Sequence, residues 1–399
     1  MSVGAPPDLR GWPPPGLDVG PDGPRRRPRS PLRRAAAALI AMPLVAGTLI
    51  LATRPWGSAP VAQPGLVREQ TFTLAWGVQH DSPAFQDGPR TYVTVVAVAP
   101  GHAPVAVVIP VGTVVDIPGG GPGIVGQALE SPGLLVAVAQ ATLDRKMDHY
   151  LLSTETDVMA LVDRLGGITV QVQEAFPWGD DVLGPGPERL FGAGVLAYLE
   201  AGAAGDLPLE GGDAEEGSEE ETEAGDDTAG RWQDVLWGLF SASREPDRWT
   251  GLVGESDEKD AHLLLARAGG AVVNELPTVP GDDGSILVDT RAVADMVRRS
   301  FPAPTEDLIR VVVFNGNGRA GLGLEIGTIL APAGYRVVAA QNASTFDVAE
   351  TEIVAATEGL LGRAQEVRTL LGVGKVYVGP QPTGIGDIVI VAGKDFKGD

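Results

Sequence analysis

The sequence contains no cysteine and only four histidines among its 399 residues. The missing cysteine excludes a disulfide framework and any metal site built on thiolates. The histidines are too scattered to show the spacing of a metal site; they are His80, His102, His149 and His262. Neither a nucleophile elbow nor a phosphate-binding Walker loop is present. Common hydrolase, zinc and P-loop nucleotide chemistries therefore have no signature here, and we expect no cofactor and no metal.

Positive charge is also scarce, because 30 Lys and Arg face 52 Asp and Glu, for a net charge of −22. The imbalance is concentrated between Glu200 and Asp227, which hold 12 acidic residues and no Lys or Arg. Such a stretch repels itself and stays solvated. It lacks the ligand spacing of a calcium-binding loop, which makes cation binding the weaker interpretation. We therefore predict a disordered acidic insertion at residues 200–228.

The first 70 residues have a different composition from the rest. Residues 1–34 are rich in Pro, Gly and Arg, and we predict a disordered cytoplasmic tail there. Residues 35–52 form 18 uncharged residues, close to the minimum that crosses about 30 Å of hydrocarbon. The arginines in front of this segment place the N-terminus in the cytoplasm and the remainder outside. Residues 53–70 are then expected to be a linker.

Two other interpretations of residues 35–52 exist, namely a cleaved signal peptide and a buried helix of a soluble domain. The long charged prefix and the missing small-residue cleavage site favour an uncleaved anchor. Next to a membrane span, the arginines are expected to contact anionic headgroups rather than nucleic acid. The predicted localisation is the cell membrane, with a single transmembrane helix and extracytoplasmic C-terminal domains.

Residues 71–301 show interleaved strand and helix patterns. Short runs of β-branched residues predict strands over 71–78, 90–99, 105–109, 150–153 and 168–172. Helical spacing predicts helices over 134–143, 156–165, 195–199, 230–241, 262–276 and 290–300. The turn that contains His102 favours an antiparallel hairpin. Interleaved elements of this kind predict an α/β domain of layers around a mixed sheet.

A second unit follows the prolines of residues 302–308, which are typical of a linker. Strands are expected at 309–314, 336–340 and 388–391, and helices at 322–330 and 358–371. The roughly 90 residues of 309–396 suffice for a small, separate α/β domain.

One glycine motif in this unit matches the pattern of a dinucleotide-binding site. Gly316, Gly318 and Gly321 form G-x-G-x-x-G between a predicted strand and a predicted helix. The second strand, however, ends at Gln341 and Asn342, with no carboxylate for a ribose hydroxyl. We therefore interpret the glycines as a tight turn with close helix packing.

The C-terminal unit resembles a known family. The segments VVVFNGNGRAGLG, GYRVVAAQNAS and GDIVIVAGKDF are similar to the LytR C-terminal domain of Gram-positive cell-envelope proteins. The resemblance covers most of residues 309–396. It implies a wall-associated protein, with an actinobacterial source as the leading expectation, and it implies no catalytic residues.

Residues 88–240 resemble the LytR-CpsA-Psr (LCP) family, which transfers glycopolymers from a polyprenyl-pyrophosphate carrier to peptidoglycan. The framework signatures are matched by Arg90-Thr91, Ile109-Pro110 with Thr113, Met147–Tyr150, Leu161–Asp163, Leu165–Ile168, Leu196–Tyr198 and Arg231–Gln233. The resemblance implies an LCP-like fold for residues 71–301.

The departures from this family fall on its working residues. Tyr92 stands at the metal-binding Asp, Val111 and Gly112 at an Arg and an Asp, and Glu200 and Gly202 at an Arg pair. The residual phosphate-site candidates are Arg90, Arg231 and Gln233. Cleavage of a pyrophosphate needs cations where negative charge develops, and losing one such donor commonly costs about 10²–10³ in rate. We therefore interpret the chain as a degenerate, non-catalytic relative without catalytic residues.

This interpretation predicts a protein that binds or organises wall glycopolymer, peptidoglycan, polyprenyl lipid or protein partners, and no nucleic acid. One alternative is a weak glycopolymer–peptidoglycan phosphotransferase that uses Arg90 and Arg231 with Asp87 or Asp116 as further ligands. This alternative requires those groups to converge on one pocket. A second alternative is a lipid-binding module that keeps an apolar groove, which requires a cavity between sheet and helices.

Overall fold

The computed structural model describes residues 71–81, 92–178, 181–203, 228–242, 249, 254–256, 261–304, 306–380 and 384–398. Residues 68–399 form one compact unit. The predicted tail, the predicted transmembrane helix at 35–52 and the predicted linker at 53–70 lie outside the described residues. Within the described ranges, no helix has the length and apolar character needed to cross a membrane.

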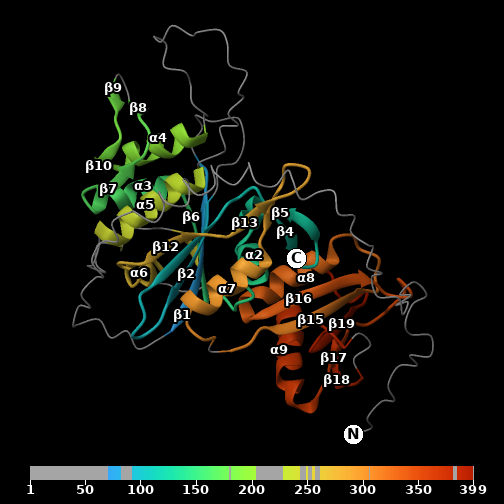
Figure 1. Cartoon of the computed structure of the whole chain (residues 1–399). Helices are drawn as coiled ribbons and strands as arrows, with labels where there is room; N and C mark the ends of the chain where they lie inside the picture. The colour runs from blue at the N-terminus through green and yellow to red at the C-terminus, as the bar shows by residue number, and fades with distance from the viewer. Residues whose placement is uncertain are drawn as a thin grey trace, which may run out of the picture. The chain divides into compact units, whose positions relative to one another are not determined.

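The N-terminal part, residues 71–301, is built on a six-stranded mixed sheet (Figure 1). In spatial order its strands are β11 (Glu255–Ser256), β6 (His149–Thr154), β1 (Phe72–Gln79), β2 (Tyr92–Val98), β3 (Val105–Ile109) and β12 (Val272–Glu275). β1, β2 and β3 pair antiparallel, as the hairpin prediction required, whereas β6 runs parallel to β1 and β12 parallel to β3. The predicted mixed sheet is therefore confirmed.

Both faces of this sheet are covered. Because side chains alternate along a strand, Leu74 and Trp76 of β1 face one side and Ala75 faces the other. The first side carries α3 (Glu155–Arg164), α4 (Gly192–Ala203) and α5 (Thr228–Ala242), drawn in green and yellow in Figure 1. The second carries the 3₁₀ turn η1 (Val125–Glu130) and α2 (Pro132–Leu143). The sheet is thus buried on both faces, which explains its nearly continuous apolar strands.

Local capping explains where two of these helices begin. Ser131 accepts a hydrogen bond from the Leu134 amide, and Pro132 takes the first position of α2, where its missing N–H costs nothing. Thr154 and Asp157 form a reciprocal capping box at the start of α3. The predicted helices at 134–143 and 156–165 are confirmed, each starting slightly earlier than expected.

Smaller elements complete the N-terminal part. A four-stranded sheet has the order β13 (Thr278–Pro280), β14 (Ile286–Val288), β4 (Thr113–Ile117), β5 (Gly121–Ile124). Two strand pairs join β7 (Ile168–Val172) to β10 (Gly186–Leu190) and β8 (Phe176–Trp178) to β9 (Asp181–Leu183). The helices α6 (Ala261–Ala266) and α7 (Thr290–Ser300) follow.

Two sequence predictions need correction here. The helix expected at 262–276 ends at Ala266, because Gly270, at φ 78°, lies in a turn that leads into the β-branched strand β12. The acidic insertion was expected from residue 200, but α4 continues to Ala203 and α5 already starts at Thr228. Residues 204–227 lie outside the described residues.

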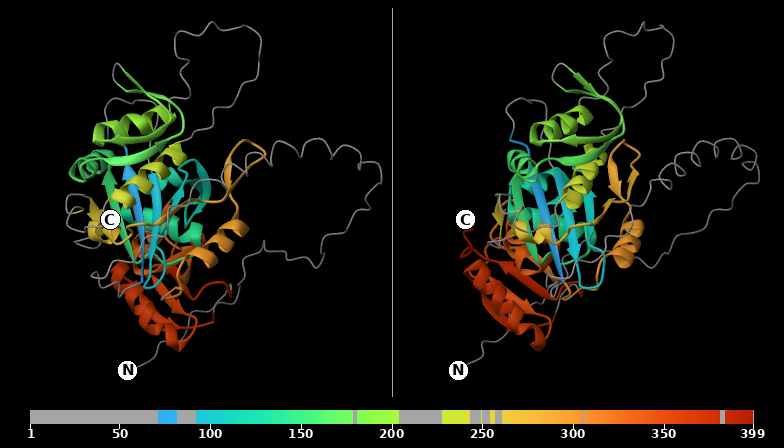
Figure 2. Two further views of the ribbon diagram at one scale, coloured as in Figure 1. Left: turned by 60° about the vertical axis from the view of Figure 1, so that its left-hand side comes forward. Right: turned by 90° about the vertical axis from the view of Figure 1, so that its left-hand side faces the viewer.

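The C-terminal part, residues 309–398, forms a separate five-stranded sheet, red in Figure 2. Its order is β16 (Tyr335–Asn342), β15 (Ile309–Asn315), β19 (Ile388–Ala392), β17 (Glu352–Ala355), β18 (Lys375–Val378). The helical elements are α8 (Leu322–Leu330), η3 (Ala331–Ala333), η4 (Glu358–Leu360) and α9 (Leu361–Leu371).

The glycine motif of this part forms a turn. The Asn315 side-chain oxygen accepts hydrogen bonds from the amides of Asn317 and Gly318. Gly318 and Gly321 adopt φ of 78° and 74°, which favours glycine, and Gly321 is the N-cap of α8. These glycines thus connect β15 to α8 by a tight turn, in agreement with the interpretation of the sequence.

A buried glutamine links the two parts. Gln140 on α2 is 0% exposed, and its Nε2 donates to the carbonyl oxygens of Ala331 at 3.2 Å and Tyr335 at 3.4 Å. Its Oε1 accepts from the Met147 amide at 3.2 Å. A buried amide with both ends satisfied favours one specific arrangement of its neighbours, because leaving its partners unpaired is costly.

Glycines allow the two parts to approach closely. A Cβ atom at Gly133 of α2 would lie 2.3 Å from the Thr328 carbonyl oxygen of α8. At Gly119 it would lie 2.1 Å from the Gly323 carbonyl oxygen. Real Cβ atoms do not come this near to backbone oxygens, so only glycine fits these positions. We refer to this contact of residues 118–140 with residues 323–335 as the seam.

Tyr335 makes the stability of the C-terminal part sensitive to alkaline pH. Tyr335 is 1% exposed, and its hydroxyl shares one proton between the Glu366 carboxylate at 2.7 Å and the Arg363 carbonyl at 2.9 Å. Burial and then the Glu366 carboxylate raise the pKa of Tyr335 well above its ordinary value of 10.0. Above about pH 10 the unfolded chain releases the proton and the folded chain keeps it, so the unfolding free energy falls by up to about 1.4 kcal/mol per pH unit.

Tyr335→Phe keeps the ring and removes the ionisable group. Urea unfolding between pH 8 and 11 is expected to show a shallower alkaline loss of stability in this variant than in the wild type. An identical slope in both proteins would contradict the assignment to Tyr335.

Candidate functional site

The register of the first sheet gathers several sequence-predicted positions at one edge. Val78 pairs with Tyr92, and Val93 pairs with Ile109, so β1 ends where β2 begins and β3 ends. The turn with Val111 and Gly112 follows β3 directly. Arg90 and Asp87, which precede Tyr92, lie outside the described residues. We call this edge the LCP-like edge, because the resemblance assigns the family's metal and phosphate ligands to it.

Tyr92 lies in an aromatic cluster at this edge. Tyr92 is 3% exposed, and its ring stacks on Trp232 of α5 with 4.4 Å between the ring centroids and 20° between the ring planes. Trp232 also meets Trp76 edge-on at 5.6 Å and donates its indole N–H to Thr94 Oγ1 at 2.9 Å. The position to which the resemblance assigns a metal-binding Asp therefore holds a buried ring that is part of the core.

The turn after β3 presents backbone and no charge. The Thr113 amide donates to the Pro110 carbonyl at 3.0 Å, and the Gly126 amide donates to the Val111 carbonyl at 2.9 Å. Val111 is half-buried and Gly112 is exposed. Where the family pattern expects an Arg and an Asp, the turn can offer neither a cation nor a carboxylate.

Arg231 connects two helices. It is 8% exposed, its Nη1 donates to the Tyr198 carbonyl at 2.9 Å, and its guanidinium lies 5.0 Å from the centroid of the Tyr198 ring. The Tyr198 hydroxyl in turn donates to Asp234 at 3.0 Å. Glu200 and Gly202 lie farther along the same helix, α4. Arg231 thus joins α4 to α5, which is a sufficient structural role for a buried guanidinium.

Gln233, the third candidate, points elsewhere. Its amide Nε2 donates to the Glu275 carboxylate at 3.1 Å, at the end of β12. Arg231 and Gln233 therefore contact different elements although both lie on α5. The structure brings Tyr92 and Trp232 together, whereas Arg231 and Gln233, the two retained polar residues in the described part of the chain, contact different elements.

Asp116, a further ligand of the transferase alternative, lies on β4 of the four-stranded sheet, on the α2 side of the first sheet. It is exposed on β4, and its neighbours Val115 and Ile117 belong to the core on the α2 side. Trp232, next to Arg231, belongs to the core on the α5 side. Asp116 and Arg231 therefore do not converge.

Large side chains fill the layer between the first sheet and helices α4 and α5. The biggest of them are at most 1% exposed; they are Trp76, Tyr198, Trp232, Phe240 and Trp249. An apolar groove for a polyprenyl tail would need this volume, so the packing argues against the lipid-binding alternative in this layer.

The structure shows a pair of ionisable side chains, His80 and Glu155, at the LCP-like edge that was not predicted from the sequence. His80 Nδ1 lies 2.5 Å from Glu155 Oε2, and Glu155 is 3% exposed. The parallel register of Gln79 with Thr154 places the two next residues side by side. The missed signal was therefore the parallel pairing of β1 and β6, which sequence spacing alone does not reveal. Within the described ranges no three His, Asp or Glu side chains gather to hold a metal ion.

Comparison with known families identifies the C-terminal part. Residues 308–396 match the profile of the family described as LytR cell envelope-related transcriptional attenuator. This match confirms the resemblance of the C-terminal part to the LytR C-terminal domain. No curated protein sequence matches the chain.

Solved structures of LCP proteins are similar to the chain at low identity. TagU of B. subtilis is 17% identical, with a TM-score of 0.41, over 60% of this chain and 100% of TagU. TagT of B. subtilis is 17% identical, with a TM-score of 0.41, over 61% of this chain and 94% of TagT. The LytR-Csp2A-Psr enzyme from Actinomyces oris is 15% identical, with a TM-score of 0.44, over 58% of this chain and 90% of that enzyme. These values are too low to transfer an activity or a ligand to this chain.

Proposed function

We propose that this chain is a non-catalytic LCP-like protein of the cell envelope, anchored in the membrane through residues 35–52, with its C-terminal domains outside the cytoplasm. In this proposal it binds or organises wall glycopolymer, the lipid carrier or protein partners. The C-terminal match to a cell envelope-related family supports the envelope assignment.

The observation that carries the non-catalytic part is the packing of Tyr92. A metal ligand must present oxygen to a cation, and its place at the LCP-like edge is taken by a ring stacked on Trp232. The neighbouring turn at Val111 and Gly112 adds no charge. A pyrophosphate bond would then be cleaved without this metal ligand and without most of the arginines that normally stabilise the developing charge.

A hydrolysis assay tests this proposal. Full-length protein in detergent is incubated with a polyprenyl-pyrophosphate analogue and Mg²⁺, next to a catalytically active LCP protein as the positive control. We expect no release of product above the protein-free blank, because donors that are each worth about 10²–10³ in rate are missing together.

Arg231→Ala is the matched variant for this assay. Hydrolysis by the wild type that disappears in Arg231→Ala would overturn the proposal and establish the weak phosphotransferase instead. Equal background in both proteins agrees with the structural role of Arg231 between α4 and α5.

A further inference from the structure

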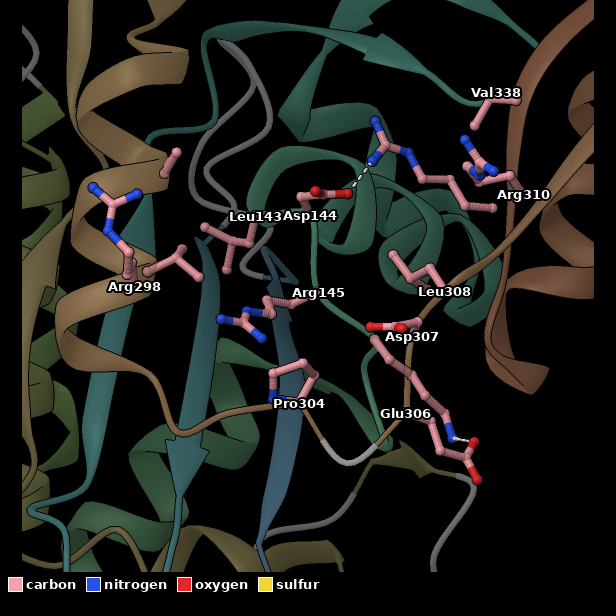
Figure 3. A pocket seen from close by; sticks show the side chains of 14 residues that line it. Leu143, Asp144, Arg145, Arg298, Pro304, Glu306, Asp307, Leu308, Arg310 and Val338 are labelled. Atoms are coloured by element: carbon pink, nitrogen blue, oxygen red, sulfur yellow. Dashed lines mark hydrogen bonds and ion pairs between the residues drawn. The ribbon is translucent and has the colours of Figure 1, made fainter. Parts of the chain in front are cut away.

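A pocket of about 450 Å³ lies next to the seam (Figure 3). Its lining includes Leu143 and Val297, which belong to the core on the α2 side of the first sheet. Its walls come from the end of α2, from α7, from Pro304 and residues 306–308, and from β15 and β16. The volume is in the range of sites that hold small molecules. Gln140 and the glycines of the seam fix the two parts against each other, so both walls are held in place.

The chain reverses sharply at the pocket. Asp144 caps α2 in a left-handed conformation, at φ 50° and ψ 46°, the one positive φ outside glycine among the described residues. After this turn, the side chains of Asp144 and Lys146 pair with different residues. Asp144 pairs with Arg336 at 2.6 Å and Lys146 with Glu306 at 2.9 Å. In the sequence, Arg145 lies between Asp144 and Lys146, which make these two ion pairs.

Cations outnumber anions in the pocket wall. The cations are Arg145, Lys146, Arg298, Arg310 and Arg336, and the anions are Asp144, Glu306 and Asp307. Four of the cations have acidic partners, two of which, Asp295 and Asp387, lie outside the wall. Arg145 has no ion pair or side-chain hydrogen bond with any residue in the described part of the chain. In Figure 3 its guanidinium lies near Pro304, without a dashed line.

An unpaired, half-buried guanidinium is a ready ligand for an oxyanion, because its fork of N–H donors matches a carboxylate or a phosphate. Arg298 can provide a second guanidinium for the same oxyanion, because little stability is lost when it leaves its present partner. Its ion pair with Asp295 lies within α7 and its side chain is 73% exposed, and such surface pairs contribute little. Leu143 and Val297 give the pocket lining an apolar part, next to which the uncharged body of a ligand can lie.

We propose that this pocket binds a small molecule carrying one oxyanion group, a phosphate or a carboxylate, with Arg145 as its principal ligand and Arg298 as the second. The exposed Asp307 in the same wall limits the positive charge, so the site accepts a single anionic group rather than a polyanion. This inference does not depend on the proposed function, because no residue of the LCP-like edge takes part.

Calorimetric titration of the full-length protein in detergent, at low ionic strength, tests the site. The probes are inorganic phosphate, glucose 1-phosphate and glucuronate, which separate a phosphate source from a carboxylate source. We expect glucose 1-phosphate or glucuronate to bind and Arg145→Ala to weaken that binding at least about tenfold, the loss typical of a charge-assisted hydrogen bond.

Arg164→Ala is the control, since Arg164 is an exposed arginine at the end of α3, outside the pocket. It should bind like the wild type. Arg145→Lys keeps the charge but not the fork and should fall between the wild type and Arg145→Ala. The proposal is wrong if the wild type binds none of the three probes, or if Arg145→Ala binds as well as the wild type. Neither result affects the hydrolysis assay, so the two proposals fail separately.

Discussion

Tyr92→Asp is expected to lower the unfolding free energy by at least about 3 kcal/mol, although it restores the residue type that the LCP pattern has at this position. The ring of Tyr92 is buried against Trp232, so the change removes a stacked aromatic pair and leaves a cavity. It also places a carboxylate in an apolar cluster, where the charged form is poorly solvated. Urea unfolding at neutral pH measures the loss.

Tyr92→Phe is the matched control, because it keeps the ring and its stacking on Trp232. We expect it to retain most of the stability that Tyr92→Asp loses. A Tyr92→Asp protein as stable as the wild type would show that the edge has room for a carboxylate and a metal. That result would remove the main support for a non-catalytic protein.

Gly119→Ala is expected to separate the C-terminal part from the N-terminal part. The new methyl group would lie 2.1 Å from the Gly323 carbonyl oxygen, and backbone cannot move aside as a flexible side chain can. The left-handed φ of 80° adds a further cost of about 1–2 kcal/mol for a residue with a Cβ atom. We expect one cooperative urea transition in the wild type and two in the variant, together with faster proteolysis in residues 302–308.

Gly121→Ala controls for the backbone cost. Gly121 has a φ of 88°, close to that of Gly119, but nothing lies within 4 Å of the position of its Cβ. In this variant the unfolding free energy should fall only by the backbone cost of the left-handed conformation, and urea unfolding should still show a single transition. If Gly119→Ala and Gly121→Ala unfold alike, the seam does not couple the two parts.

Local patterns were sufficient for much of the fold. The strands β3 and β19 are apolar along their whole length, and β2 is apolar except for Thr94, which is typical of buried strands. The helix α3 carries its start signal in Thr154 and Asp157. The C-terminal resemblance was also confirmed, since its motifs are contiguous in the sequence.

Local sequence patterns could not predict which strands pair when the strands lie far apart in the sequence. Val272 and Val273 extend a predicted helix when counted by spacing, yet they form β12, because β3 offers an open parallel edge about 165 residues earlier. The pairing of His80 with Glu155 has the same origin in the parallel register of β1 and β6. Propensity is a weak guide wherever a distant strand decides the outcome.

The sequence by itself determined that the turn after Ile109 carries Val111 and Gly112, and that Tyr92 stands at the position to which the resemblance assigns an Asp. Those are statements about which chemical groups exist. Only the tertiary structure decided that Tyr92 fills the core, that Arg231 holds α4 to α5, and that Arg145 faces a pocket beside the seam. The physical reason is that burial and charge pairing depend on neighbours, and these neighbours lie far away in the chain.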